Sequence, residues 1–347
     1  MEQNFTLQPV TEQPLNAETP LNALNQTLTP TELFYIRNHF DIPVLDSDQF
    51  ELIINGAVAK PLGLTLSQLH EYPEKSLTVV MECAGNGRSS MRPVIIGTPW
   101  NLGAISQAIF TGIPLHNILE AAHISEDTKE IRFTGADVGL LRTGKTEYYV
   151  RSLPLEIALH PDTILVWEMN GERLSAQHGF PLRLVVPGWY GMASVKWLRE
   201  ITVLTEPFQG FFQTQEYIYI GEQGIQDQTP VTNMRVRSMI IDPDAGSSLR
   251  KDEILLSGIA WSGDGEVVKV ELSFDGGESW SVAALQTTSS TYEAARWEYN
   301  WQPKEAGRYT IITRAADSSG NVQPLESLWN KGGYGNNVVH QITLSIE

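Results

Sequence analysis

The sequence predicts an α+β region followed by an all-β sandwich of the immunoglobulin type. The chain has 347 residues, which exceeds the usual size of a domain built around a single hydrophobic core, so two domains are expected. Before Val231 short strand patterns mix with helical ones, but strand–helix–strand units are too few for a doubly wound sheet. Beyond Val231 apolar and polar residues alternate in short runs between Gly-rich turns, which is typical of an antiparallel sandwich.

The elements of the first region follow from local pattern. Residues 1–30, rich in Gln, Asn, Thr and Pro, predict an extended arm that is weakly ordered unless it docks on the body. In the first domain, residues 31–210, apolar and β-branched runs predict strands at 50–56, 77–81, 164–168 and 182–186. Helical patterns in the same domain lie at 103–111, 114–123 and 154–159.

The second region begins after a change in composition. Residues 211–230 lose periodicity and gain Gln, Gly and aromatic residues, so we interpret them as a linker. Residues 231–347 form the predicted sandwich, in which Asp275-Gly276 supplies a turn signal. The residues expected to face its core are Val268, Val270, Leu272, Phe274, Trp297, Tyr299, Trp301, Tyr309, Ile311 and Thr313.

Composition excludes several classes of protein. The net charge of −17 argues against a nucleic-acid binder and against docking on anionic membranes. The single cysteine rules out an intrachain disulfide framework, a Cys₄ zinc site and a Cys-ligated iron–sulfur cluster. The sequence contains no apolar run of transmembrane length and no secretory signal, so we expect a cytoplasmic protein, or a periplasmic one if a signal has been removed.

That cysteine, Cys83, is the first candidate for chemistry. It follows the strand predicted at 77–81 and opens a loop with the sequence CAGNGRSS, in which the backbone can turn sharply. Arg88 lies five residues further on, and a nearby guanidinium would lower the pKa of the thiol and favour the thiolate that binds metals. The alternative from the residues alone is an inert buried cysteine.

A second candidate segment begins at His178. His178 and Arg183 flank a predicted strand start and can donate to one phosphate, and the loop containing Gly188 and Gly191 lets backbone N–H groups approach an anion. Taken alone, the segment also fits a turn between two strands with a solvated arginine. A hydrolase using Cys83 and His178 lacks a third, orienting residue at a recognisable spacing.

Together these segments resemble the sulfite oxidase family of molybdenum enzymes. The matching stretches are 34–39 (FYIRNH), 83–89 (CAGNGRS), 103–106 (GAIS), 167–171 (WEMNG), 178–183 (HGFPLR), 195–198 (VKWL), 260–263 (AWSG), 273–280 (SFDGGESW) and 321–324 (NVQP). Each motif alone is soft, but their order along most of the chain is specific to the family. The resemblance implies a bacterial-type member without a haem domain, in which a molybdopterin-binding domain precedes an immunoglobulin-like dimerisation domain.

The resemblance also implies roles for individual residues. Cys83 would be the one protein ligand of molybdenum. The residues matching the cofactor pocket are His39, Asp137, His178, Arg183, Ser194 and Lys196. Those matching the oxyanion pocket are Arg37, Arg88, Trp100 and Tyr149, with Tyr149 expected to hydrogen-bond to the substrate or to an oxo group. The implied reaction is oxidation of sulfite to sulfate by oxo transfer from Mo(VI), with electrons passed to oxygen or a separate carrier protein.

Two departures from the family pattern keep other substrates open. Lys331 or Gly332 stands where relatives often have a pocket arginine, and Gly87 stands where another arginine is common. A lysine supplies charge but not a planar fork. The alternatives are reduction of an S-oxide, an N-oxide or nitrate with the same cofactor, and, more distantly, a non-catalytic β-sandwich binding protein. A homodimer is expected from the resemblance.

Overall fold

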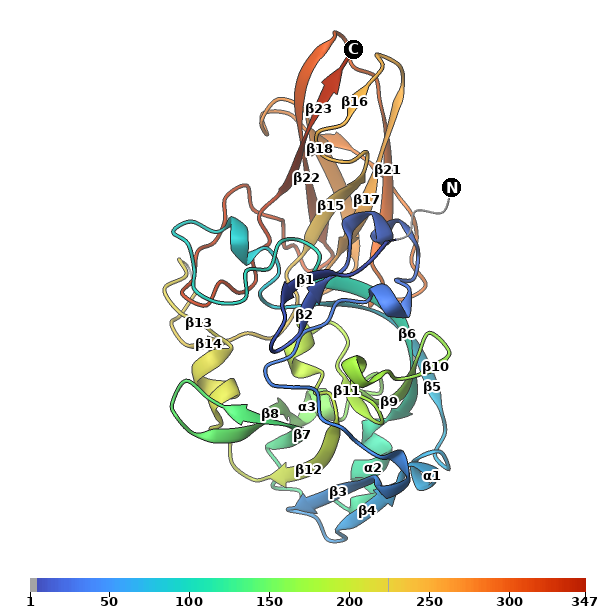
Figure 1. Cartoon of the computed structure of the whole chain (residues 1–347), viewed down its shortest axis with the longest axis vertical. Helices are drawn as coiled ribbons and strands as arrows, with labels where there is room; N and C mark the ends of the chain where they lie inside the picture. Colours follow the sequence, from blue (N-terminus) through green and yellow to red (C-terminus); the bar gives the residue numbers. More distant parts are fainter. Residues whose placement is uncertain (1–4, 224) are drawn as a thin grey trace.

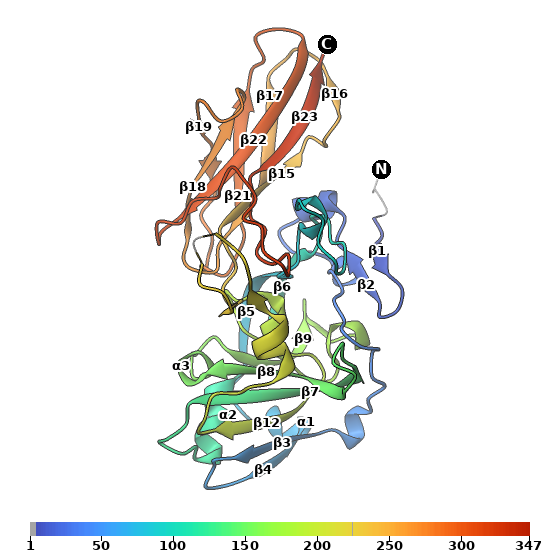
Figure 2. The ribbon, with the colours of Figure 1, turned by 90° about the vertical axis from the view of Figure 1, so that its left-hand side faces the viewer.

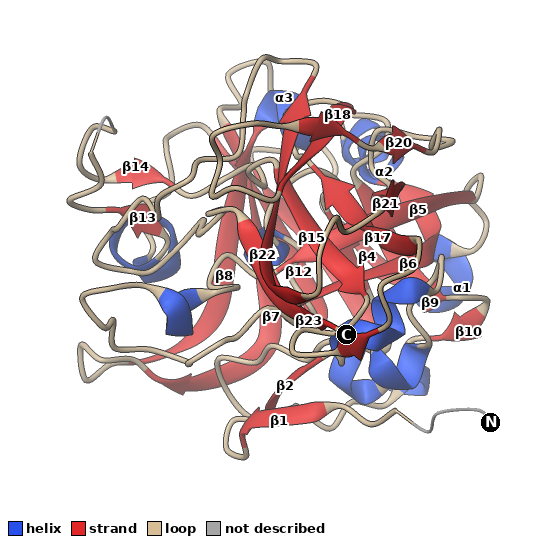
Figure 3. Cartoon of the chain, turned by 90° about the horizontal axis from the view of Figure 1, so that it is seen from above, coloured by secondary structure: helices blue, strands red, loops and turns tan. Residues whose placement is uncertain are grey.

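The computed structural model describes residues 5–223 and 225–347 and has two stacked regions, with the sandwich above and a mixed region below (Figure 1). Strands dominate both, and the helices are short, as Figure 3 shows. This arrangement confirms the predicted fold class. None of the described helices, in residues 5–223 and 225–347, is long and apolar enough to cross a membrane.

Two sheets build the lower region. One has the order β10-β9-β6-β5, with β11 also paired to β9, and the other has the order β4-β3-β12-β7-β8. The strands of the first sheet are β5 (Lys75–Glu82), β6 (Ile105–Pro114), β9 (Ile164–Met169), β10 (Glu172–Arg173) and β11 (Arg183–Val185). The strands of the second are β3 (Glu51–Gly56), β4 (Leu62–Thr65), β7 (Glu130–Leu140), β8 (Thr146–Pro154) and β12 (Leu198–Leu204). The short helices are α1 (Leu66–Leu69), α2 (Leu115–Ala122) and α3 (Leu155–Ala158).

Most elements predicted for this region are present, but one is of the wrong type. The strands at 50–56, 77–81, 164–168 and 182–186 and the helices at 114–123 and 154–159 correspond to β3, β5, β9, β11, α2 and α3. The helix predicted at 103–111 is wrong, because β6 occupies that stretch and pairs with both β5 and β9. β6 is a central strand buried almost without interruption, so its residues show no alternation by which periodicity could distinguish it from a buried helix.

The N-terminal arm is docked on the body. From residue 5 onward, the part within the described residues, it forms a hairpin of β1 (Gln8–Thr11) and β2 (Asn16–Glu18). Ala17 and Ile36 exchange backbone hydrogen bonds of 3.0 and 2.9 Å, and Thr19 Oγ1 donates to the Leu33 carbonyl at 2.8 Å. The arm therefore orders the segment that carries Arg37.

The segment predicted as a linker packs against the lower region. It contains a helical turn at Phe212–Glu216 and two short strands, β13 (Ile218–Tyr219) and β14 (Thr229–Pro230), that pair with each other. Five of its aromatic or aliphatic side chains are buried: Phe211, Phe212, Tyr217, Ile218 and Tyr219. The aromatic residues of the segment interpreted as a linker form a cluster beside the lower region.

The upper region is the predicted sandwich, seen from another side in Figure 2. One sheet comprises β15 (Arg237–Asp242), β17 (Ile254–Trp261), β21 (Ala295–Trp301) and β20 (Ala284–Leu285). The other comprises β16 (Ser248–Leu249), β23 (His340–Ile346), β22 (Gly307–Asp317), β18 (Val267–Ser273) and β19 (Ser281–Val282). Val268 does not face the core as predicted but is 55% exposed, because the pairing of β18 with β22 shifts register there.

The loop between β22 and β23 returns to the lower region. Trp329 Nε1 donates to the Pro93 carbonyl at 3.0 Å, and the Lys331 amide donates to the Ile220 carbonyl at 2.9 Å. The Gly335 amide donates to the Ala84 carbonyl at 2.8 Å. The sandwich therefore contributes directly to the surroundings of Cys83.

Candidate active site

Cys83 lies directly after β5, in a loop with several internal hydrogen bonds. Its amide donates to the Ala104 carbonyl at 2.9 Å, and its carbonyl accepts from the Asn86 amide at 2.9 Å. Gly87 has a φ of +81°, a left-handed conformation that favours glycine and turns the chain toward Arg88. The thiol is buried, at 6% exposure for the residue.

Two cavities meet at this thiol. Cys83, Arg37 and Tyr217 line both of them. The first cavity has a volume of about 50 Å³ and lies within the lower region. The second has a volume of about 600 Å³ and is bounded partly by the loop that returns from the sandwich. A ligand in one cavity and a ligand in the other would therefore meet beside Cys83.

All six residues predicted for a cofactor pocket line the first cavity: His39, Asp137, His178, Arg183, Ser194 and Lys196. The backbone fixes several of them. Arg183 Nη1 donates to the His178 carbonyl at 3.0 Å, and Arg183 Nη2 donates to the Ser194 carbonyl at 3.3 Å. Lys196 Nζ donates to the Gln177 carbonyl at 2.7 Å. The cis Phe180-Pro181 bond lies between His178 and Arg183.

The electrostatics of the first cavity favour an anionic ligand. Burial and the charges of Lys196 and Arg183 lower the pKa of His178 to about 3. Burial, and then the neighbouring Arg183, hold the pKa of Lys196 well below its usual value. Burial lowers the pKa of Arg183 to about 10. Burial is the largest cause of each shift, so a phosphate placed among these groups would stabilise their charged forms.

Asp137 adds a different kind of group to this cavity. Burial raises its pKa to about 6, although the charge of Lys196 opposes the shift. Its Oδ1 atom is buried and has no hydrogen-bond partner among the described residues. A buried acceptor without a donor costs free energy, so it fits a ligand that brings N–H groups, as a pterin ring does. The donor set of the first cavity thus suits a molybdopterin with its phosphate.

The second cavity contains the predicted oxyanion residues except Tyr149. Arg37, Arg88 and Trp100 line it. Arg88 Nη1 donates to the Thr98 carbonyl at 2.9 Å and Arg88 Nε to the Gly332 carbonyl at 3.1 Å, so its guanidinium is held in place. Lys331 also lines this cavity and brings a further cation to its wall.

Tyr149 lies elsewhere than the sequence led us to expect. It lines only the first cavity, stacks on the His39 ring at 4.6 Å, and donates its hydroxyl to the Met192 carbonyl at 2.6 Å. Tyr217 instead lies at the junction of both cavities, with its hydroxyl 2.7 Å from His39 Nε2. Burial raises the pKa of Tyr217 to about 12, so its hydroxyl stays protonated at neutral pH. Sequence reasoning missed Tyr217 because it falls in the aromatic stretch interpreted as a linker.

Arg88 is only one of several groups that shift the pKa of the Cys83 thiol. Burial raises the pKa of Cys83, while Arg37, the Gly85 amide and Arg88 lower it. Arg88 therefore lowers the pKa of the thiol as expected, but burial outweighs it in the protein without a metal. A metal ion bound at the sulfur would remove the proton outright.

Comparisons with known proteins agree with this site. Residues 39–212 match the oxidoreductase molybdopterin binding domain, and residues 228–347 match the Mo-co oxidoreductase dimerisation domain. The chain is 36% identical to the mitochondrial sulfite oxidase of Drosophila melanogaster over 98% of its length, and 32% identical to the sulfite oxidase of Arabidopsis thaliana over 96%. It covers 63% of the Drosophila protein and 93% of the Arabidopsis protein.

A solved structure extends the similarity to the whole fold. The sulfane dehydrogenase SoxCD from Paracoccus pantotrophus superposes with a TM-score of 0.85 at 27% identity, covering 99% of this chain and 90% of that one. The two domain matches together cover most of the chain, in the order that the sequence predicted. The chain therefore belongs to the sulfite oxidase family of molybdopterin-binding oxidoreductases.

Proposed function

We propose that this protein oxidises sulfite to sulfate with a molybdenum cofactor bound in the first cavity and the anion bound in the second. One observation carries the proposal: the only thiol of the chain lies where the two cavities meet. The sulfite oxidases among its relatives support the choice of substrate. The cofactor would supply two-electron redox chemistry and transfer of an oxygen atom, with Cys83 as the protein ligand of the metal.

The residues of the first cavity would bind and orient the cofactor. Arg183 and Lys196 carry charge toward a phosphate, and His178, which is neutral at physiological pH, can donate or accept there. Asp137 would accept from the N–H groups of the pterin. His39 is also neutral, because burial and then Arg37 hold its pKa well below the usual value.

The residues of the second cavity would bind the substrate. The protein carries a net charge of −17, which repels a dianion, so local cations must compensate. Arg37 and Arg88 line the second cavity together with Cys83, and a guanidinium group can bind two oxygens of an oxyanion. Tyr217 would donate its hydroxyl at the junction, where burial excludes bulk water.

Electron transfer and assembly belong to the same proposal. After each turnover two electrons must leave singly, to oxygen or to a separate carrier protein. We also propose a homodimer, which the match of residues 228–347 to a dimerisation domain supports. Sedimentation of the purified full chain would test it.

The proposal is tested by a steady-state assay of molybdenum-replete protein with sulfite and ferricyanide. We expect turnover in the wild type and none in Cys83→Ser, because a hydroxyl is a poor replacement for a thiolate ligand. Unfolding by urea would control for the fold of the variant. Full activity of Cys83→Ser would remove the ligand role. If the molybdenum-loaded wild type does not oxidise sulfite, the proposed substrate is wrong. The same preparation should then be assayed with nitrate and with S- and N-oxides.

A second candidate substrate follows from the shape of the second cavity. Its volume of about 600 Å³ is far larger than one sulfite ion, and Val94 and Ile96 on its wall are 76% and 100% exposed. An apolar wall suits a larger substrate that carries sulfur at its end. The sulfane dehydrogenase of similar fold supports this class. Turnover of glutathione persulfide at a higher kcat/KM than sulfite would favour the second candidate.

A further inference from the structure

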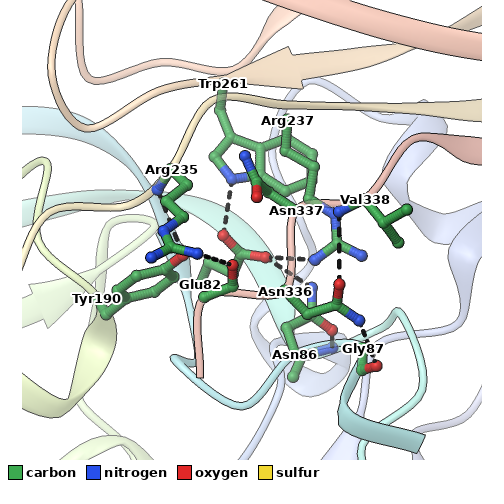
Figure 4. Close-up of polar contacts among 12 residues, drawn as sticks. Glu82, Asn86, Gly87, Tyr190, Arg235, Arg237, Trp261, Asn336, Asn337 and Val338 are labelled. Carbon is green, nitrogen blue, oxygen red and sulfur yellow. Dashed lines mark hydrogen bonds and ion pairs between the residues drawn. The ribbon is translucent and has the colours of Figure 1, made fainter. Parts of the chain in front are cut away.

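The residue before Cys83 is a buried carboxylate held by the other domain. Glu82 Oε1 accepts from Arg237 Nη1 at 2.8 Å and from Asn86 Nδ2 at 2.9 Å, and Glu82 Oε2 accepts from Trp261 Nε1 at 2.9 Å (Figure 4). Arg237 begins β15 and Trp261 ends β17, so both come from the sandwich. Glu82 and Arg237 are each 2% exposed and Trp261 is fully buried.

The same contacts reach the whole Cys83 loop. Asn86, bound to Glu82, also accepts from the Ala104 amide at 3.2 Å through Oδ1. A Cβ atom on Gly87 would lie 3.2 Å from Arg237 Nη2 and 3.1 Å from Asn336 Nδ2, so the sandwich packs directly against that turn. Asn336 Nδ2 donates to the Gly87 carbonyl at 2.8 Å. Asn336 therefore holds the Gly87 end of the turn directly, and the sandwich reaches Asn86 through Glu82.

We propose that Glu82 is a positioning residue, which transmits the packing of the sandwich to the Cys83 thiol through its contacts with Arg237 and Trp261. The effect of Glu82 on catalysis rests on the proposed function, in which the thiol binds the metal. The effect of Glu82 on the position of the thiol does not rest on it, and can be tested in protein without cofactor.

The chemistry of the three donors explains why a carboxylate stands at this position. A carboxylate accepts at both oxygens and donates at neither, so it can satisfy Arg237, Trp261 and Asn86 together. A glutamine amide has one accepting oxygen, and its NH₂ group would face one of the donors. Glu82→Gln therefore breaks at least one contact and leaves Arg237 buried without its counter-charge.

The test measures the alkylation of Cys83 by iodoacetamide in the cofactor-free full chain. The chain has one cysteine, so the mass of the intact protein reports its modification directly. We expect Glu82→Gln to raise the rate about tenfold through opening of the loop, and Trp261→Phe, which loses one N–H donor, to raise it by a smaller factor. Tyr292→Phe is the matched control, because it removes a 2.9 Å bond between the sandwich and Asp162 that is not part of the Cys83 loop.

The dependence on urea separates local opening from loss of stability. A fast rate that is independent of low urea concentrations indicates opening of the loop alone and supports the proposal. A rate equal to the wild-type rate in folded Glu82→Gln overturns it. A fast rate that rises with urea as steeply as global unfolding also overturns it, because the effect would then be merely structural.

The loaded enzyme supplies a second readout. At equal molybdenum content we expect Glu82→Gln to lower kcat for sulfite about tenfold with KM within about twofold, since Arg37 and Arg88 are untouched. A raised KM with unchanged kcat would assign Glu82 to substrate binding and contradict the proposal. If the wild type does not oxidise sulfite, the proposed function fails, whereas the alkylation result still decides the position of the thiol.

Discussion

Two tyrosines, 149 and 217, differ in what their hydroxyl groups contact. The Tyr149 hydroxyl is occupied by the Met192 carbonyl, whereas Tyr217 lines both cavities and reaches His39. We expect Tyr149→Phe to lower the free energy of unfolding by about 1–2 kcal/mol, because it leaves a buried acceptor unpaired, while turnover is retained. We expect Tyr217→Phe to lower kcat/KM about tenfold or more.

Urea unfolding and steady-state kinetics on both variants check this assignment. Each tyrosine is the other's control, since both are buried and both lose one hydroxyl. A larger loss of activity in Tyr149→Phe than in Tyr217→Phe would restore the role first expected for Tyr149.

Most residues predicted for the candidate site lie in ordered motifs of the sequence. Cys83, Arg88, His178 and Arg183 belong to contiguous runs, and the structure brings them to the walls of two cavities that meet. Tyr217 belongs to no such run. Its position depends on how residues 211–219 pack against the lower region, a tertiary contact that no local pattern reports.

At the scale of elements, β6 illustrates the limit of periodicity. Its residues are buried almost without interruption, and Phe110 and Ile113 are fully buried between β5 and β9. Without alternation in burial, periodicity cannot tell such a strand from a buried helix. The stretches at 77–81 and 164–168 carry β-branched residues that favour strands, and there the prediction of type succeeded. In the sandwich the pattern failed at Val268, where a bulge reversed the facing of one residue.

Gly112 in β6 gives a test of this packing. A Cβ atom there would lie 1.9 Å from the Leu165 carbonyl oxygen in β9, beside a register shift between Thr111 and Gly112. We expect Gly112→Ala to lower the free energy of unfolding by about 1–3 kcal/mol through overpacking. Gly144→Ala is the control, with a φ of +80° but open space around its Cβ, and should cost about 1 kcal/mol. Equal losses in urea unfolding would mean that β9 moves aside to make room.

At the scale of the molecule, the two domains form one unit around the site. A buried pair crosses between them at Glu82–Arg237, with a separation of 2.8 Å, and a second pair, Glu222–Arg235, joins the 211–230 segment to the sandwich at 2.6 Å. Glu222 lies in the segment interpreted as a linker, and also accepts from Asn330 of the returning loop at 3.0 Å. The sequence predicted the fold class of both regions. It could not predict that the second region would complete a cavity of the first, because the residues that line this cavity lie far apart along the chain.

The stability of the sandwich also depends on pH, through His340 at the start of β23. Its Nδ1 atom accepts from the Ile240 amide at 3.1 Å, and burial together with Arg237 lowers its pKa to about 4. In the unfolded chain the pKa is near the ordinary value of about 6.5, so between those values the unfolded state binds more protons. Stability from this group is therefore fully present above pH 6.5 and is lost as the pH falls toward 4.

We expect His340→Gln, which keeps an acceptor for Ile240, to lose less stability than the wild type between pH 7 and 4. The difference should be about 1–2 kcal/mol, less than the full 1.4 kcal/mol per pKa unit, because the ring is partly exposed. Urea unfolding of the cofactor-free full chain at several pH values measures it. His178→Gln is the comparison, since His178 titrates in the same window but lies in the lower region. Parallel curves for His340→Gln and the wild type would mean that the pKa of His340 is the same in the folded and unfolded states.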